Sequence, residues 1–296
     1  MRIAACGLVG LTLFLSACAS VIGLDEGVLD EGVLDGGVGD GGVGDGGLGE
    51  GCPSGRGPAM VRVPGPDGVG SDYCMDRTEV TAAQYDEWLN QPPDPAKQPA
   101  ICSFNTDFKP SPSGTYCGNY MFAETVADDG NEPMRCADWC DATAFCQWAG
   151  KRLCGKIGGG TNPQSAALDA NSSEWYRACS RAGERKFPYG DAYDKKACVG
   201  ADFNDLEGFQ PMTDYPHDVG SFETCQGGYE GLFDMSGNLQ EWEGSCNVTV
   251  GKDDKCYARG GAYRDSIALL SCSDVAEYSR GVGAIMVGFR CCADVK

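Results

Sequence analysis

One stretch near the end of the chain, RGGAYRDSIALLSC (residues 259–272), places a single cysteine, Cys272, after a pair of glycines and a mixed polar and apolar run. The stretch looks like the wall of an active site that holds reactive thiols. Only one thiol is present in it, however. Cys272 is therefore either half of a catalytic centre or one end of a structural bridge.

The first residues have the pattern of an export signal. Arg2 supplies a positive end, an apolar run follows over residues 8–15, and the sequence LSAC ends at Cys18. The apolar run is too short to span a bilayer as a mature helix. An ordinary secretory signal is one interpretation. The L-S-A-C order favours a bacterial lipoprotein signal over residues 1–17, with Cys18 taking the lipid that anchors the chain to a membrane.

The cysteine content also indicates export. Of 18 cysteines, Cys6 leaves with the signal and Cys18 carries lipid, so an even number remains. In an oxidising compartment such cysteines form disulfides. Zinc is the rival, but the chain has one histidine, His217, and no paired C-x-x-C motif. A lone histidine also argues against a Ser-His-Asp hydrolase. We expect a protein of the bacterial cell envelope, at the outer membrane or cell surface.

Charge and low complexity set the next expectations. The formal net charge is −20, which argues against a nucleic-acid partner because phosphate neutralisation needs basic residues. Residues 24–48 form five acidic, glycine-rich pentapeptides. Calcium-binding β-rolls use a nine-residue repeat, so the five-residue period favours a flexible tether. We assign this tether to residues 18–51.

Residues 52–296 have the composition of one domain, with aromatic residues, cysteines and turn residues spread evenly. Three short helices are expected within it. The first lies in TAAQYDEWL, where Thr81 and Gln84 form a capping box. The second lies in DWCDATAFCQWAGKRL and the third in SSEWYRACSRAG, which Gly183 closes. The rest predicts short strands and loops, which makes the fold class α+β, with much irregular structure and many disulfides.

Four segments in this order resemble the formylglycine-generating enzyme, or sulfatase-modifying factor, family. They are YCMDRTEVTAAQYDEWL (73–89), DWCDATAFCQWAGKRL (138–153), EGLFDMSGNLQEW (230–242), and RGGAY (259–263) followed by GFRC (288–291). The combination of DMSGNLQEW with RGGAY and GFR is far more specific than any one piece. The resemblance covers residues 58–292 and implies a C-type-lectin-like fold with little regular secondary structure.

Active members of that family oxidise a sulfatase cysteine to formylglycine, using oxygen and copper(I) held by two thiolates. Residues 259–271 contain no cysteine, and Asp265 is a poor ligand for copper(I), so copper is not expected. By position Cys272 matches the family's third, structural cysteine. The resemblance implies that Cys179 is its partner, and that Cys146 pairs with Cys291.

The DMSGNLQEW segment matches a calcium site of the family. The resemblance implies carboxylate ligands from Asp234 and Glu241 and backbone carbonyl ligands from Gly237 and Leu239. These are the hard oxygen ligands that calcium prefers. The alternative is that the apolar residues of this segment pack in the core while the acidic side chains face water.

The sequence therefore predicts a divergent, lipid-anchored family member that lacks the copper-binding cysteine pair and is non-catalytic. We expect a binding or accessory module for an unknown protein or glycan ligand. The alternatives are an oxidoreductase or other enzyme that uses a different site on the same scaffold, and a structural lipoprotein. Aromatic residues at the mouth of a cavity near residues 259–270 would favour binding, and convergent titratable groups would favour catalysis.

Overall fold

The structure is a computed structural model, and it describes residues 49–91, 93–110, 117–118, 120–203, 215–247 and 250–296. The predicted signal, the lipidated Cys18 and almost all of the predicted tether lie outside these residues. Within them, no helix is long and apolar enough to cross a membrane. Residues 49–51 already contact the domain, because the backbone N–H of Lys296 donates to the carbonyl of Gly51.

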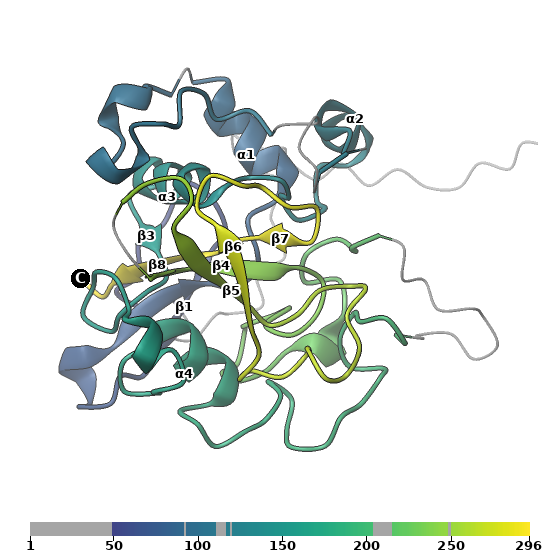
Figure 1. Ribbon diagram of the computed structural model, residues 1–296. Helices are drawn as coiled ribbons and strands as arrows, with labels where there is room; N and C mark the ends of the chain where they lie inside the picture. Colours follow the sequence, from purple (N-terminus) through teal and green to yellow (C-terminus); the bar gives the residue numbers. More distant parts are fainter. Residues whose placement is uncertain (1–48, 92, 111–116, 119, 204–214, 248–249) are drawn as a thin grey trace, which may run out of the picture. The chain divides into compact units, whose positions relative to one another are not determined.

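Two four-stranded sheets form the centre of the domain (Figure 1). The first has the order β1-β2-β8-β3, and its strands are Met60–Val63, Tyr73–Asp76, Cys291–Asp294 and Arg152–Leu153. The second has the order β6-β5-β4-β7, with strands Val275–Ser279, Lys255–Arg259, Gln240–Cys246 and Val287–Gly288. The last strand of the chain, β8, pairs antiparallel with both β2 and β3. Strands from the beginning, the middle and the end of the domain therefore lie in one sheet.

Four short α-helices accompany the sheets in the described part of the chain: α1 Ala82–Leu89, α2 Phe122–Asp128, α3 Trp139–Trp148 and α4 Glu174–Ser180. Five 3-10 turns complete the elements there, at Val69–Ser71, Pro95–Lys97, Ala100–Cys102, Gln164–Ala166 and Glu223–Cys225. Long loops link them. The predicted α+β class with much irregular structure is confirmed.

The three predicted helices are present. The Thr81 hydroxyl accepts from the Gln84 N–H, and the Gln84 side chain accepts from the Thr81 N–H, so the capping box of α1 is confirmed. The predicted end of α4 at Gly183 is wrong. The helix ends at Ser180 because Arg181 adopts a left-handed conformation with φ of 51°. Helix α2 was not predicted; none of its residues is buried, so it has no apolar periodicity to reveal it.

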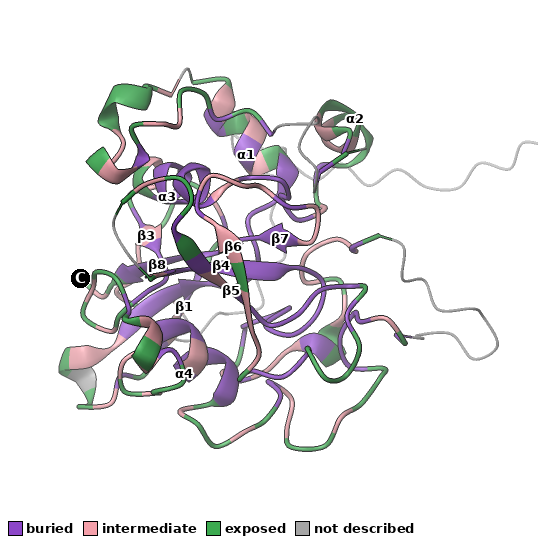
Figure 2. Ribbon diagram, viewed as in Figure 1, coloured by how far each residue is buried: buried purple, intermediate pink, exposed green. Residues whose placement is uncertain are grey.

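Aromatic residues build the core on the α1 and α3 side of the sheets. Tyr85 of α1 stacks on Phe145 of α3, with ring centroids 5.7 Å apart, and Phe289 meets both rings edge to face. A second buried group, around Trp175 of α4 and Met75 of β2, packs on the other side. Figure 2 shows α3 and most of the strands as largely buried, whereas β6 and α2 are half-buried or exposed.

Eight disulfides join all sixteen cysteines between Cys52 and Cys292: Cys52–Cys74, Cys102–Cys140, Cys117–Cys136, Cys146–Cys291, Cys154–Cys292, Cys179–Cys272, Cys198–Cys225 and Cys246–Cys256. Two of these, Cys146–Cys291 and Cys179–Cys272, are the pairs that the family resemblance implied. The adjacent cysteines of β8 tie the C-terminal strand to α3 and to the segment that follows β3. Distant parts of the chain are therefore linked covalently.

Candidate functional site: a buried charge cluster and a cavity beside α2

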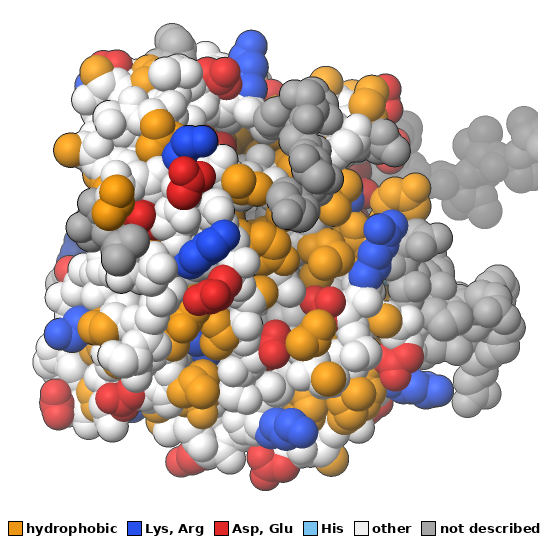
Figure 3. Space-filling model, in the orientation of Figure 1, with side chains coloured by type: hydrophobic (Ala, Val, Ile, Leu, Met, Phe, Trp, Pro, Cys, Tyr) orange, Lys and Arg blue, Asp and Glu red, His pale blue; other side chains and the backbone are white. Residues whose placement is uncertain are grey.

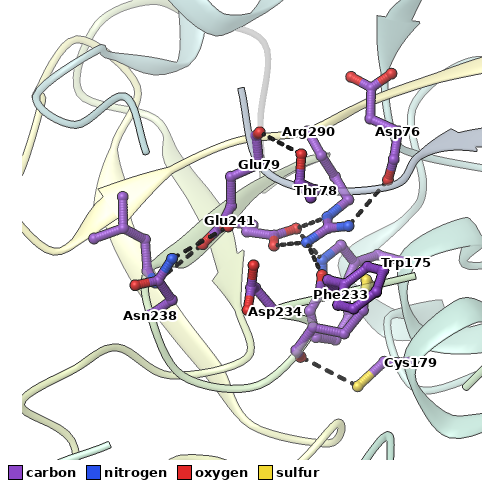
Figure 4. Close-up of polar contacts among 12 residues, drawn as sticks. Asp76, Thr78, Glu79, Trp175, Cys179, Phe233, Asp234, Asn238, Glu241 and Arg290 are labelled. Atoms are coloured by element: carbon purple, nitrogen blue, oxygen red, sulfur yellow. Dashed lines mark hydrogen bonds and ion pairs between the residues drawn. The ribbon is translucent and has the colours of Figure 1, made fainter. Parts of the chain in front are cut away.

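A buried charge cluster surrounds Arg290, which lies between β7 and β8 (Figure 4). Its guanidinium donates from Nη2 to Glu241 Oε1 at 2.6 Å and from Nε to Glu241 Oε2 at 2.7 Å, and neither side chain is exposed. Trp175 donates its indole N–H to the same Oε2 at 2.7 Å. Arg290 also donates to the carbonyls of Asp76 and Phe233. We call these residues, with Glu79, Asp234 and Asn238, the Arg290 cluster.

Two further carboxyl groups of the Arg290 cluster have fewer partners. Asp234 accepts a hydrogen bond from the Gly220 N–H at 2.6 Å, and Glu79 accepts longer ones from Leu239 N at 3.3 Å and Asn238 Nδ2 at 3.4 Å. Burial raises the pKa of Asp234 to about 6. Burial, together with the charges of Asp234 and Glu241, raises the pKa of Glu79 well above its usual value.

A tight turn positions these acids. Asp234, Gly237 and Asn238 all have positive φ, at 58°, 75° and 56°. Gly237 is required by space as well, because a Cβ at this position would lie 2.1 Å from the carbonyl oxygen of Val199. The turn leads directly into β4, whose second residue is Glu241. The same local geometry therefore sets both acidic side chains of the DMSGNLQEW segment against Arg290.

The structure brings Asp234 and Glu241, two of the expected calcium ligands, into one cluster. It adds Glu79, which sequence reasoning did not single out, although Glu79 lies in the EVT sequence just before α1. Both Glu241 oxygens are already engaged by Arg290 and Trp175. The cluster has three carboxyl groups and one guanidinium. The oxygens of Asp234 and Glu79 therefore fit a cation better than those of Glu241. In the described part of the chain, no group of three or more His, Cys, Asp or Glu side chains is arranged to hold a metal ion.

The RGGAY segment is fixed by its own polar contacts. Arg259 is fully buried, where it donates to the carbonyls of Ala167 and Cys272 and lies over the ring of Trp175. Asp265 Oδ2 accepts from the Ala262 N–H at 2.9 Å and from Gln240 Nε2 at 3.1 Å. The loop that would carry the copper thiolates is therefore closed by a carboxylate, and its end is held by the Cys179–Cys272 disulfide.

A cavity of about 940 Å³ opens beside this segment, and we call it the α2 cavity. Its wall is formed by α2 and the surrounding loops: Gly118, Tyr120, Met121, Glu124, Thr125, Ala127, Asp128, Glu132, Arg135, Tyr215, Tyr263, Arg264 and Ile285. At its mouth, Tyr215 is 68% exposed and Met121 is 54% exposed. Figure 3 shows hydrophobic side chains gathered beside and below α2 on the face in view.

Charged groups of the α2 cavity are held by neighbours. The Arg135 guanidinium lies 4.8 Å from the centre of the Tyr120 ring, and its Nη2 forms an ion pair with Glu132. The guanidinium of Arg264 lies 5.3 Å from the centre of the Tyr263 ring. Sequence reasoning placed a cavity near residues 259–270 but missed most of its wall, because α2, Arg135 and Tyr215 are far from that segment in the chain.

The fold and the cysteine framework can now be set beside known proteins. The sequence matches the sulfatase-modifying factor enzyme 1-like domain (FGE-sulfatase) over residues 56–295, and the chain belongs to this family. The formylglycine-generating enzymes of Mus musculus and Bos taurus are each 29% identical to it over 196 residues, which is 57% of this chain and 46% of theirs. The chain thus spans about half the length of the curated relatives it matches.

Two solved structures share the fold. CarF superposes with a TM-score of 0.50 at 18% identity, covering 76% of this chain and 87% of that one. PvdO from Pseudomonas aeruginosa has the same TM-score and identity and covers 80% of this chain and 94% of that one. At this level of identity the likeness concerns the fold alone.

Proposed function

We propose that this chain is a non-catalytic member of its family and works as a glycan-binding module of the bacterial envelope, with the ligand in the α2 cavity. One observation carries the first half. Every cysteine between Cys52 and Cys292 is in a disulfide, so the described part of the chain offers no thiol for copper(I). The family's thiol oxidation needs a thiolate pair, and Asp265 and its neighbours do not replace it.

The wall of the α2 cavity supports binding. Its volume lies in the range of ligand sites, and its mouth carries an exposed tyrosine, Tyr215. None of the lining residues belongs to a strand, so the cavity has no free strand edge with which an extended peptide could pair. Aromatic faces and carboxylates instead suit a ligand with apolar faces and many hydroxyl groups, which favours a glycan.

A glycan array tests this proposal. The full chain in detergent is compared with Tyr215→Ala, which removes the exposed ring of the mouth, and with Leu168→Ala. Leu168 is a matched control because it is 52% exposed and lies outside the α2 cavity. We expect the wild type and Leu168→Ala to retain the same glycans and Tyr215→Ala to lose them. Absence of retention by the wild type, or equal retention by Tyr215→Ala, would refute the proposal.

A calcium ion in the Arg290 cluster is the second part of the proposal. The surplus of buried carboxyl groups over guanidinium supports it, since buried charges need a partner. Asp234 and Glu79 would supply carboxylate oxygens, and the carbonyls of Gly237 and Leu239 would complete the set. When bound, the ion would neutralise the acids and hold the turn before β4 against the EVT segment.

Anchoring by lipid on Cys18 completes the proposal, and residues 18–51 would act as the acidic tether. Two or three acyl chains hold a protein firmly at a membrane, whereas one holds it weakly. Cell fractionation of Cys18→Ala tests the anchor, because this variant should leave the membrane fraction or accumulate unprocessed. Unchanged membrane retention of Cys18→Ala would contradict it.

A further inference from the structure

A second cavity, of about 350 Å³, lies beside the C-terminal halves of α1 and α3 and the 3-10 turn Pro95–Lys97. We call it the Arg56 cavity. It shares no described lining residue with the α2 cavity, so it is a separate site. Its volume lies at the lower end of the range of ligand sites, which suits a small ligand or one terminal residue of a larger one.

Arg56 is held in place at the rim of this cavity. Its Nη1 donates to the carbonyl of Trp148 at 3.0 Å, and its guanidinium lies 4.7 Å from the centre of the Trp148 ring. Arg56 is exposed, so its guanidinium can be reached from solvent. Within the described residues, its Nε and Nη2 form no hydrogen bond. An arginine fixed in this way presents a planar pair of donors that matches the two oxygens of a carboxylate.

Lys97 supplies a second accessible charge. It ends the 3-10 turn, is exposed, and forms no ion pair within the described residues. Asp94, which also lines the cavity, caps the same turn by accepting from the Ala96 N–H at 3.0 Å. Among the described lining residues two side chains are therefore cationic and one is acidic, in a chain whose formal net charge is −20. This local reversal of charge favours an anionic ligand.

Apolar side chains form much of the remaining wall. Trp148 and Pro93 are half-buried, so they offer apolar surface to a ligand. Trp88 and Phe108 also line the cavity; both are buried, with ring centroids 4.8 Å apart, so this part of the wall is well packed. A small hydrated anion would leave the apolar surface in contact with water. A ligand with an apolar group next to its carboxylate would cover that surface and meet the cations as well.

We propose that the Arg56 cavity binds a carboxylate that carries an apolar group. Arg56 and Lys97 bind the carboxylate, and Trp148 and Pro93 contact the apolar group. A small organic acid has this chemistry, and so does the C-terminal residue of a peptide when its side chain is apolar. The site is independent of the glycan proposed for the α2 cavity.

Ligand-observed NMR titration of the full chain in detergent tests the role of charge. 3-Phenylpropionate and 3-phenylpropanamide have nearly the same shape, but only the first has a charged head group. We expect the acid to bind at least tenfold more tightly than the amide, because hydrogen bonds to charged groups are the stronger ones. Acetate, which lacks the apolar group, should bind at least tenfold more weakly than 3-phenylpropionate. Equal affinity of the acid and the amide, or of the acid and acetate, would overturn the proposal.

A peptide arm distinguishes the two sources of the carboxylate. N-Acetyl-alanyl-phenylalanine is compared with its C-terminal amide and with 3-phenylpropionate. Tighter binding of the peptide acid than of 3-phenylpropionate would assign the site to a peptide terminus, and weaker binding would assign it to a small acid. Absence of saturable binding by both acids would overturn the proposal.

Two variants place the ligand in the Arg56 cavity. Lys97→Gln removes an exposed charge, so the melting temperature should not change, whereas the affinity for 3-phenylpropionate should fall about fivefold. Arg56→Lys keeps the charge but removes the planar pair of donors, and the affinity should fall about tenfold. Lys195→Gln is the matched control, because Lys195 is exposed and lies outside the cavity. Unchanged affinity in both cavity variants, or an equal loss in Lys195→Gln, would contradict the assignment.

Discussion

The Arg290 cluster and the α2 cavity differ in how far their side chains are buried. In the cluster, Arg290 donates to Glu241 and to two backbone carbonyls, and Glu241 also receives the indole N–H of Trp175. At the mouth of the cavity, by contrast, Tyr215 is 68% exposed and Met121 is 54% exposed. A buried, hydrogen-bonded network stabilises a fold, whereas exposed side chains around a cavity are accessible to a ligand.

The RGGAY segment resembles the Arg290 cluster in being held by contacts within the chain. In this segment, Asp265 accepts a hydrogen bond from the Ala262 N–H. The end of the loop is held by the disulfide between Cys272 and Cys179. We therefore place the proposed glycan ligand in the α2 cavity and not at a thiol of the loop of residues 259–272.

The largest effect on stability should follow from removing the disulfide that holds the end of the loop of residues 259–272. Replacing Cys179 and Cys272 together by serine releases a link across 93 residues, which the chain-entropy estimate values at about 5 kcal/mol of unfolding free energy. Denaturant unfolding measures this loss. The Cys52–Cys74 link spans only 22 residues, so its double serine variant should lose about 3 kcal/mol. A smaller loss for the longer link would contradict this account.

Breaking the charge pair of the Arg290 cluster should have the next largest effect. Arg290→Met leaves the buried Glu241 carboxylate without its guanidinium, and the unfolding free energy should fall by about 3–5 kcal/mol. The double variant with Glu241→Gln restores neutrality and should lose less than Arg290→Met alone. If the two variants unfold at the same denaturant concentration, the pair does not act through charge.

Local signals in the sequence predicted much of this fold. The start of α1 followed from Thr81 and Gln84 because a capping box is complete within four residues. The partners of Cys272 and Cys291 came from the family resemblance, since sixteen cysteines cannot be paired from spacing alone. By contrast, the end of α4 depended on the left-handed conformation of Arg181, a residue type that gives no warning of it.

The side chains around the α2 cavity were much less predictable. The α2 cavity collects Tyr120, Arg135, Tyr215 and Tyr263 from four separate loops, and no periodic pattern connects them. Glu79 joins Asp234 and Glu241 only because β2 leads the EVT segment past the turn before β4. Such contacts are set by tertiary packing, which sequence patterns do not encode locally.

Removing calcium should have a smaller effect on stability. It tests whether the Arg290 cluster holds an ion. An ion at a hundredfold excess over its Kd stabilises the folded state by about 3 kcal/mol. The melting temperature should therefore fall on chelation in the wild type and not in Asp234→Asn. Because burial raises the pKa of Asp234 to about 6, protons compete with the ion, and the gain should shrink between pH 7 and pH 5. Identical wild-type melting curves with and without chelator would refute the calcium proposal.

The most direct test of the central claim is an assay for formylglycine. The chain is incubated with a sulfatase-type cysteine peptide, copper and oxygen, and the peptide is analysed for an aldehyde by mass spectrometry. With all cysteines from Cys52 to Cys292 in disulfides, we predict no aldehyde and a non-reduced 179–272 linkage in peptide maps. Copper-dependent aldehyde formation that Cys272→Ser abolishes would contradict both the bridge and the non-catalytic assignment.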